Sequence, residues 1–231
     1  MKRIIFDFDG TLTPYPITEF KILEKCGYVG GGNNKELHKI VKDYKVNNNK
    51  SVYEAFYEVF LEVLKKYGYE LNDETLSYGA NEILYNKGIE EFFEYLSNKD
   101  VENYIVSSSM KPFLKKVAIS KYFKEIYAST FNYENNRIIG HKDLMSDIKK
   151  VDAIKEIVKD SDYANVIYIG DGLTDLKAME YIKLNGGTAI YVTDNLESVL
   201  EEDKKYISYI FNKDYSLNGE LFNTVKRILN L

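Results

Sequence analysis

Two aspartates near the start of the chain, Asp7 and Asp9, directly follow a short apolar segment and precede Gly10. Carboxylates so close together repel each other unless a cation lies between them, and a ligand set made only of oxygen favours Mg²⁺. If such a metal held a phosphate, Asp7 could attack phosphorus as a nucleophile. Asp9 could then protonate the leaving oxygen and later take a proton from water. Alone, two aspartates before a glycine more often mark a turn, but together with the strand before them and the segments described below they predict phosphoryl chemistry assisted by magnesium.

A second pair of aspartates follows a later apolar segment. Asp171 lies between two glycines after residues 166–169, and Asp175 comes four residues further on. Glycines permit a tight turn and the close approach of a ligand. We expect Asp171 to complete the metal site. We expect Asp175, one turn into the following helix, to orient a lysine or a metal-bound water.

Hydroxyl and ammonium groups come from two other segments. Ser107 and Ser108 end an apolar segment, where a hydroxyl and the amide after it can hold a phosphate oxygen. Lys150 starts a predicted helix, and its ammonium can offset the charges of the phosphate and the nucleophile as they approach. Its neighbour Lys149 is the alternative for this role. The candidate substrate-binding residues are Ser107, Ser108, Lys150 and Gly10, and the candidate catalytic residues are Asp7, Asp9, Lys150 and Asp175.

Strands and helices that alternate along the chain must position these groups. Residues 3–8 are apolar up to Asp7, as in a strand buried within a parallel sheet. After Gly88 we expect strands at 102–107, 165–169, 188–192 and 206–210, helices at 89–98, 147–159 and 217–229, and a hairpin of 126–133 with 137–141. Such alternation predicts an α/β fold, a Rossmann-like doubly wound parallel sheet with helices on both faces. Sites in such sheets lie at the carboxyl ends of the strands, where the acidic and hydroxyl residues fall.

Residues 17–84 follow a different pattern, with four helical segments and no strand signal. The expected helices span 17–27, 35–44, 51–67 and 72–86, with loops at 30–34 and 47–49. Ser51 and Glu54 have the spacing of a capping box at the start of the third helix. The sequence thus predicts two domains, an α/β catalytic core of 1–16 and 85–231 and a small all-helical cap of 17–84.

Composition restricts the partners and the setting of the protein. Its 231 residues carry a net charge of −5 without a long basic run, which gives nucleic-acid binding no support. The single cysteine, Cys26, cannot form an internal disulfide, so a reducing cytoplasm is the expected location. No apolar run reaches the roughly 18 residues that a membrane span needs, so we expect no membrane partner. The oligomeric state is left open.

In order and separation, the four segments resemble the four motifs of phosphatases of the haloacid dehalogenase superfamily. Residues 7–13 match the first motif, Ser107 the second, Lys150 the third and residues 170–175 the fourth. The resemblance covers the whole of the predicted core. The helical insertion resembles, in position and helical character alone, the cap of the subgroup that includes phosphoserine phosphatase.

The resemblance implies a Mg²⁺ ion held by the Asp7 side chain, the Asp9 carbonyl and Asp171. It also implies hydrolysis of a small phosphorylated metabolite through an aspartyl-phosphate, with Asp7 as nucleophile and Asp9 as acid and base. Two alternatives remain beside hydrolysis. The enzyme could pass the phosphoryl group to an acceptor alcohol, or the fold could be catalytically idle and serve as a binding module.

The resemblance does not identify the substrate. Phosphoserine phosphatases carry a glutamate nine residues after the nucleophile, where this chain has Pro16. They also use a cap arginine for the substrate carboxylate, and the predicted cap contains none. Phosphoserine is therefore disfavoured, and phosphocholine-type, methylthio-sugar-type and other small phosphomonoesters remain open. Candidate specificity residues are Tyr15, Glu19, Phe20 and Tyr53, whereas His38 and His141 lack ligand spacing and are expected on the surface or in the core.

Overall fold

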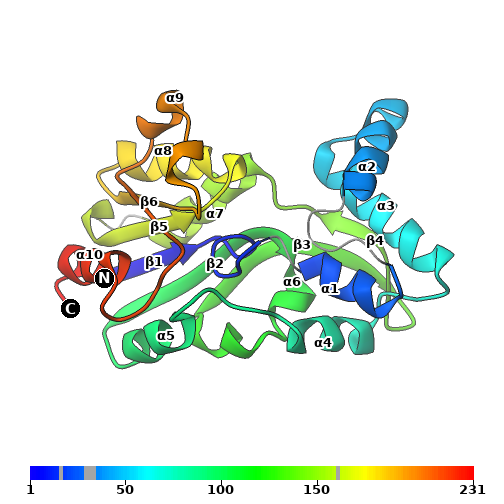
Figure 1. Ribbon diagram of the computed structural model, residues 1–231, viewed down its shortest axis with the longest axis horizontal. Helices are drawn as coiled ribbons and strands as arrows, with labels where there is room; N and C mark the ends of the chain where they lie inside the picture. Colours follow the sequence, from blue (N-terminus) through cyan, green and yellow to red (C-terminus); the bar gives the residue numbers. More distant parts are fainter. Residues whose placement is uncertain (16–17, 29–34, 160–161) are drawn as a thin grey trace.

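The computed structural model describes the chain except for residues 16–17, 29–34 and 160–161 (Figure 1). Its described residues form a seven-stranded sheet in the order β4-β3-β2-β1-β5-β6-β7. The strands are β1 (Lys2–Phe6), β2 (Val101–Met110), β3 (Glu125–Glu134), β4 (Arg137–Asp143), β5 (Val166–Gly170), β6 (Thr188–Val192) and β7 (Tyr209–Phe211). Neighbours pair in parallel except β3 and β4, which form the predicted antiparallel hairpin. The predicted Rossmann-like α/β fold is confirmed.

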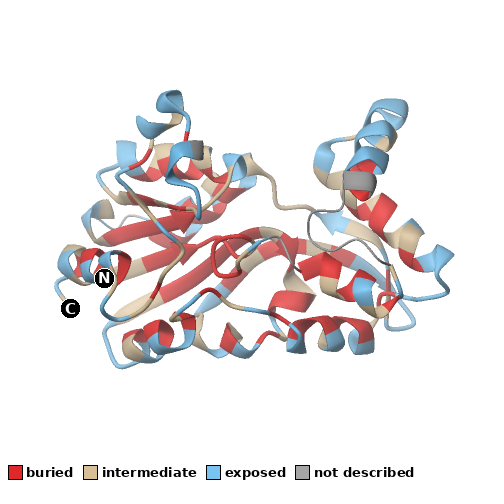
Figure 2. Ribbon diagram, viewed as in Figure 1, coloured by how far each residue is buried: buried red, intermediate tan, exposed pale blue. Residues whose placement is uncertain are grey.

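Helices cover both faces of the sheet because its central strand is apolar on both. The helices after the insertion are α5 (Ile89–Ser97), α6 (Lys111–Leu114), α7 (Asp147–Val158), α8 (Leu176–Leu184), α9 (Glu201–Lys204) and α10 (Glu220–Leu229). Ile4 and Phe6 of β1 share a buried cluster with α5 and α10, whereas Ile5 belongs to a cluster with α7 and α8. Successive strand residues face opposite sides, so the two helix pairs lie on opposite faces. Figure 2 shows the buried residues along the sheet and the inner helix faces.

Four helices of the described chain lie between β1 and α5 and make up the insertion. They are α1 (Thr18–Lys25), α2 (Lys35–Asn48), α3 (Val52–Lys66) and α4 (Asp73–Asn81). α3 begins with the predicted capping box, in which the Glu54 amide donates to the Ser51 hydroxyl at 3.2 Å and the Ser51 amide donates to the Glu54 carboxylate at 2.9 Å. α1 packs against α4, and α2 packs against α3 (Figure 1).

The insertion shares an apolar cluster with the sheet. Tyr57 of α3 meets Phe131 of β3 edge to face, with ring centroids 5.0 Å apart. The Ile138 amide of β4 donates to the Leu71 carbonyl at 2.8 Å. In addition, buried residues of α1, α3 and α4 belong to the same apolar cluster as those of α5 and α10. The division of the chain into a core and a cap at residues 17–84 remains a prediction from the sequence.

The fourth insertion helix is shorter than the sequence predicts. α4 ends at Asn81, whereas the helical pattern continues to residue 86. The Asn86 side-chain amide instead donates to the carbonyls of Thr11 and Thr13, at 2.8 and 3.1 Å. These bonds hold the loop after β1 in place. To make them, the chain leaves the helical conformation before it reaches Asn86.

Other boundaries differ for local reasons. α2 continues through most of the predicted loop at 47–49 and stops at Asn49, whose φ of 51° is left-handed. β7 is shorter and begins later than the strand predicted at 206–210. The predicted loop at 30–34 and the predicted start of the first helix at residue 17 lie outside the described residues.

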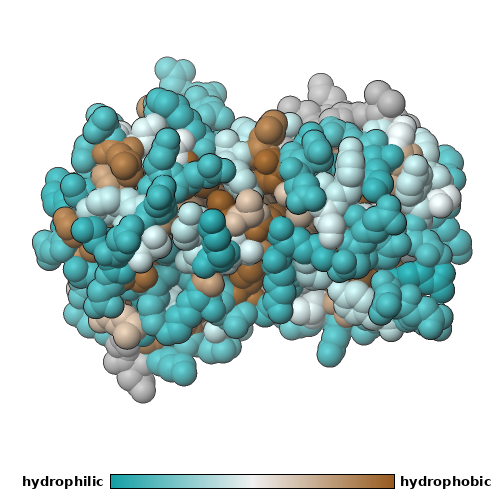
Figure 3. All heavy atoms as spheres, turned by 90° about the horizontal axis from the view of Figure 1, so that it is seen from below, coloured by the Kyte–Doolittle hydropathy of each residue, from teal (hydrophilic) through white to brown (hydrophobic). Residues whose placement is uncertain are grey.

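The molecular surface agrees with the charged composition. The face seen from below in Figure 3 is mostly hydrophilic, and its apolar side chains gather mainly near the middle. No helix in the part of the chain that the structure describes is both long and apolar enough to cross a membrane.

Candidate active site

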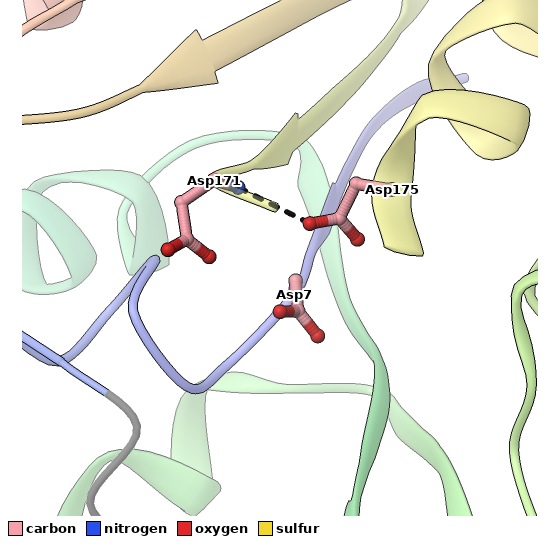
Figure 4. A group of neighbouring side chains, drawn as sticks. All are labelled: Asp7, Asp171 and Asp175. Carbon is pink, nitrogen blue, oxygen red and sulfur yellow. Dashed lines mark hydrogen bonds between the residues drawn. The ribbon is translucent and has the colours of Figure 1, made fainter. Parts of the chain in front are cut away.

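The predicted acidic residues meet where β1 and β5 end. These strands are neighbours, and the Asp7 amide continues their pairing by donating to the Ile169 carbonyl at 2.9 Å. Asp7, Asp171 and Asp175 each offer a carboxylate oxygen, and these atoms lie within 4.8 Å of one another. Figure 4 shows the three side chains gathered at the strand ends. The parallel sheet therefore brings together groups that are far apart in the sequence.

The predicted phosphate-contacting lysine, Lys150, is buried among these carboxylates. Its Nζ donates to Asp7 Oδ1 at 3.0 Å and to Asp175 Oδ1 at 2.7 Å. The alternative, Lys149, instead forms an ion pair with the exposed Asp143. Adjacent residues of a helix point about 100° apart, so only one of two consecutive lysines can face the sheet. The geometry of α7 favours Lys150.

Asp175 uses both of its oxygens to organise the loop after β5. Its Oδ1 accepts hydrogen bonds from Lys150 and, at 2.6 Å, from the Tyr168 hydroxyl. Its Oδ2 accepts from the amides of Asp171 and Gly172, at 3.2 and 3.0 Å. Asp175 lies directly before α8, which begins at Leu176, and not one turn into that helix as the sequence predicted. The sequence indicated the contact with a lysine, but gave no sign of the tyrosine hydroxyl.

Asp171 approaches the loop after β1 because Gly10 has no side chain. A Cβ atom on Gly10 would lie 2.1 Å from Asp171 Oδ2, and its φ of +79° is left-handed. Thr11 Oγ1 donates to Asp171 Oδ1 at 3.0 Å, and the Lys213 ammonium lies 3.6 Å from Oδ2. The Gly10 amide donates internally, to Thr13 Oγ1 at 3.0 Å. Gly10 is not among the residues that line the cavity described below, and its contact with substrate stays a prediction.

The acidic cluster contains too little positive charge for its carboxylates. Burial raises the pKa of Asp7 to about 8, although Lys150 opposes the shift. Burial, together with Asp175, raises the pKa of Asp171 to about 6. A divalent cation would supply the missing charge, and the Asp7 and Asp171 carboxylates are the hard oxygen ligands that Mg²⁺ prefers. Both oxygens of Asp175 already accept hydrogen bonds from the protein. Asp7 and Asp171 are therefore better suited than Asp175 to bind a metal.

The Asp9 carboxylate is held by the insertion and by β2. Thr18, the first residue of α1, donates to Asp9 Oδ1 through its amide at 3.1 Å and its hydroxyl at 2.9 Å. The Ser109 hydroxyl donates to Oδ2. A hydroxyl residue at the start of a helix is a recognisable capping signal, but its partner cannot be read from the sequence. The position of Asp9 thus depends on where α1 lies.

The hydroxyl residues near the end of β2 border the same space. β2 continues to Met110, beyond its predicted end at residue 107, and its register against β3 shifts between Ser107 and Met110. Such irregularities re-aim side chains. Ser107, Ser108 and Ser109 all border the cavity, and the Ser107 hydroxyl accepts a hydrogen bond from the Ser109 amide at 3.3 Å.

A cavity of about 370 Å³ connects the acidic cluster with the insertion helices. On the insertion side it is lined by Glu19, His38, Val41, Val52, Tyr53, Phe56 and Tyr57. Glu19 and Tyr53 were proposed as specificity residues, whereas the other two candidates, Tyr15 and Phe20, do not border the cavity. His38 also borders it, which the sequence did not predict. The second histidine, His141, does not border the cavity; its Nε2 lies 3.3 Å from Glu58 Oε1.

A comparison with protein families identifies the class to which this chain belongs. Residues 4–180 match the family model of haloacid dehalogenase-like hydrolases. This match covers well over half of the 231 residues, so the chain belongs to the haloacid dehalogenase-like hydrolase family. The predicted membership of an enzyme superfamily is confirmed.

Individual relatives are distant in sequence. Pdp3-interacting factor 1 of Schizosaccharomyces pombe is 25% identical over 187 residues, which are 76% of this chain and 76% of the relative. A substrate-bound phosphoserine phosphatase has 19% identity and a TM-score of 0.67, covering 97% of this chain and 98% of that one. Cytosolic 5'-nucleotidase IIIB bound to cytidine has 14% identity and a TM-score of 0.61, with coverages of 99% and 84%. These structures share the fold.

Proposed function

We propose that the protein is a Mg²⁺-dependent phosphatase that hydrolyses a small phosphomonoester through an aspartyl-phosphate on Asp7. The main support is the Asp7 carboxylate, which borders the cavity between the buried Lys150 ammonium and the Asp171 carboxylate. A nucleophile, a cation and a metal-binding group thus lie within reach of one phosphate. The fold that the chain shares with a phosphoserine phosphatase agrees with this chemistry.

In the first half of the reaction, an Asp7 oxygen attacks phosphorus and the bond from phosphorus to the alcohol oxygen breaks. Asp9 donates its proton to that oxygen, so the alcohol leaves as a neutral molecule. Asp7, Asp171 and the Asp9 carbonyl would hold Mg²⁺, which supplies positive charge to the phosphate oxygens. Lys150 holds Asp7 through a hydrogen bond and offsets negative charge as the two anions approach.

In the second half, water attacks the phosphorus of the aspartyl-phosphate. Asp9, now ionised, takes a proton from this water, the bond from phosphorus to Asp7 breaks, and phosphate is released. Thr18 and Ser109 keep the Asp9 carboxylate in one place through both halves, because their hydrogen bonds together reach both of its oxygens. We expect the hydroxyls of Ser107 and Ser108, which border the cavity, to bind phosphate oxygens.

The first experiment is a phosphate-release assay with Mg²⁺ and a panel of small phosphomonoesters. We expect release from one chemical class, its loss when EDTA removes the metal, and its loss in Asp7→Asn. The variant should keep its circular dichroism spectrum, since an amide occupies nearly the same volume as the carboxyl. Undiminished release by Asp7→Asn would contradict the nucleophile, and phosphorylated alcohols formed in the presence of added acceptors would indicate transfer instead of hydrolysis.

A further inference from the structure

The described charges around the cavity provide no partner for a second anionic group on the substrate. Four acidic residues border it, Asp7, Asp9, Glu19 and Asp171, together with the single ammonium of Lys150. That ammonium already forms ion pairs at 3.0 and 2.7 Å with two carboxylates of the cluster. Among the described residues that border the cavity, none offers a guanidinium or an uncommitted ammonium.

Glu19 lies near the place that the alcohol part of an ester would occupy. The residue before it, Thr18, binds the Asp9 carboxylate, which is proposed to protonate the leaving oxygen, and the charge of Asp9 contributes to the raised pKa of Glu19. The residue is only 7% exposed, yet it borders the cavity. Its Oε1 accepts a hydrogen bond from the Tyr57 hydroxyl at 3.0 Å.

Glu19 has no cationic partner among the side chains that the structure describes. It forms no ion pair with any residue within 1–15, 18–28, 37–159, 162–197 or 199–231. Burial, with a contribution from Asp9, raises the pKa of its carboxyl to about 8. Buried carboxyl groups are normally paired or hydrogen-bonded to capacity. A hydroxyl or ammonium group of a ligand would complete this site, whereas an anion would add to the repulsion.

The remaining wall does not favour anions either. Val41, Val52 and Phe56 are apolar, and Tyr53 adds an aromatic ring. Apolar and aromatic side chains accommodate alkyl groups, and ring faces attract ammonium groups. Of the side chains described on this wall, His38 alone can become cationic, so it has to be tested as a possible anion partner.

We propose that this cavity takes phosphomonoesters of alcohols without an anionic group, and that Glu19 is the residue that discriminates against a second negative charge. The inference rests on the proposed phosphatase function and names its substrate class. A carboxylate on the alcohol would be buried beside Glu19, and no described residue that borders the cavity offers it an uncommitted counter-charge, which is costly. A hydroxyl or amine at the same place would donate to Glu19, and such charge-assisted bonds are strong.

The test uses pairs of esters that differ mainly by one carboxylate. Phosphoethanolamine is compared with phosphoserine, and glycerol phosphate with phosphoglycerate, by kcat/KM above pH 8 where Glu19 is ionised. We expect the wild-type enzyme to prefer the member without a carboxylate by about tenfold or more in both pairs. Glu19→Gln should reduce both ratios by about tenfold, mainly by improving the carboxylated member.

Two variants serve as controls. Glu62→Gln removes the same charge from the exposed side of α3 and should leave both ratios unchanged. His38→Gln should leave them unchanged as well. Three results would each overturn the proposal. The wild-type enzyme could prefer the carboxylated esters, His38→Gln could abolish the preference for the uncarboxylated esters, or Glu19→Gln could leave both ratios unchanged.

Binding to Asp7→Asn separates this inference from the proposed function. The variant cannot form the aspartyl-phosphate, so calorimetry with Mg²⁺ and the intact esters gives the ratios of Kd without turnover. If wild type and variant release phosphate equally, the mechanism fails, yet a Kd preference for the uncarboxylated esters still supports the substrate class. If turnover depends on Asp7 but Kd favours the carboxylated esters, the mechanism stands and the substrate class is wrong.

Discussion

Lys150 and Asp175 form an ion pair of 2.7 Å whose side chains are 1% and 0% exposed. The pair joins the first turn of α7 to the loop after β5, and the same ammonium reaches Asp7 after β1. Three separate segments are thus tied together at one buried cation. The arrangement positions the nucleophile, and it makes the stability of the site depend on a charge that has no contact with solvent.

Removing this ammonium should abolish turnover and destabilise the fold. In Lys150→Met the two carboxylates lose their buried partner, and breaking such a pair costs about 3–5 kcal/mol. Lys149→Met is the matched control, because Lys149 pairs with Asp143 at the surface, and its free energy of unfolding should change by only about 0.5 kcal/mol. Urea unfolding and phosphate release measure both effects. Equal effects of the two substitutions would contradict the assignment of Lys150.

Adding one methyl group at Gly10 should displace Asp171. A Cβ there would lie 2.1 Å from Asp171 Oδ2, whereas Gly68, with a similar φ of +75°, has open space around it. Gly68→Ala should cost roughly 1 kcal/mol for the left-handed backbone alone. Gly10→Ala should cost more and should weaken Mg²⁺ binding, as measured by urea unfolding and by metal titration calorimetry. Unchanged metal affinity in Gly10→Ala would argue against Asp171 as a ligand.

The hydroxyl of Thr18 should matter for the rate more than for substrate binding. It donates to Asp9 Oδ1 at 2.9 Å, and Thr18→Val removes this bond while keeping the side-chain shape. We expect kcat to fall about tenfold to hundredfold with little change in KM, because a misplaced catalytic group slows the chemical step. Thr18→Ser retains the hydroxyl and should restore most of the rate. A loss of equal size in both variants would indicate a role in packing only.

Glu19 should make the protein less stable as the pH rises. Its pKa is raised from 4.5 to about 8 in the folded state by burial, so between these values the folded protein keeps a proton that the unfolded chain releases. Stability from this group is complete below pH 4.5 and is lost as the pH approaches 8, by up to about 1.4 kcal/mol per pH unit. Asp7 contributes with the same sign, so the slope is compared between wild type and Glu19→Gln. Urea unfolding at a series of pH values should give a flatter profile for the variant; identical profiles would mean that the pKa of Glu19 is the same in the folded and unfolded states.

The sequence by itself determined the features that depend on short segments. Three local patterns were visible in the sequence, and the structure contains each of them: an apolar strand directly before Asp7, glycines on either side of Asp171, and the capping pair of Ser51 and Glu54. The first strand ends at Phe6, two residues before its predicted end. The alternation of strands and helices predicted the sheet, and the parallel sheet in turn predicted that these aspartates meet. Such inferences succeed because backbone pairing and hydrophobic periodicity act over a few residues at a time.

The tertiary structure alone decided which side chains meet across the site. Lys150 faces the cluster and Lys149 does not, because the rotation of α7 is fixed by its packing on the sheet. The bond from Thr18 to Asp9 and the burial of Glu19 beside the cavity depend on where the insertion folds back. Asn86 leaves its predicted helix for the same reason, since its amide serves a loop that is more than seventy residues away in the chain. Contacts of this kind are set by the packing of whole elements, and no local preference of the residues records them.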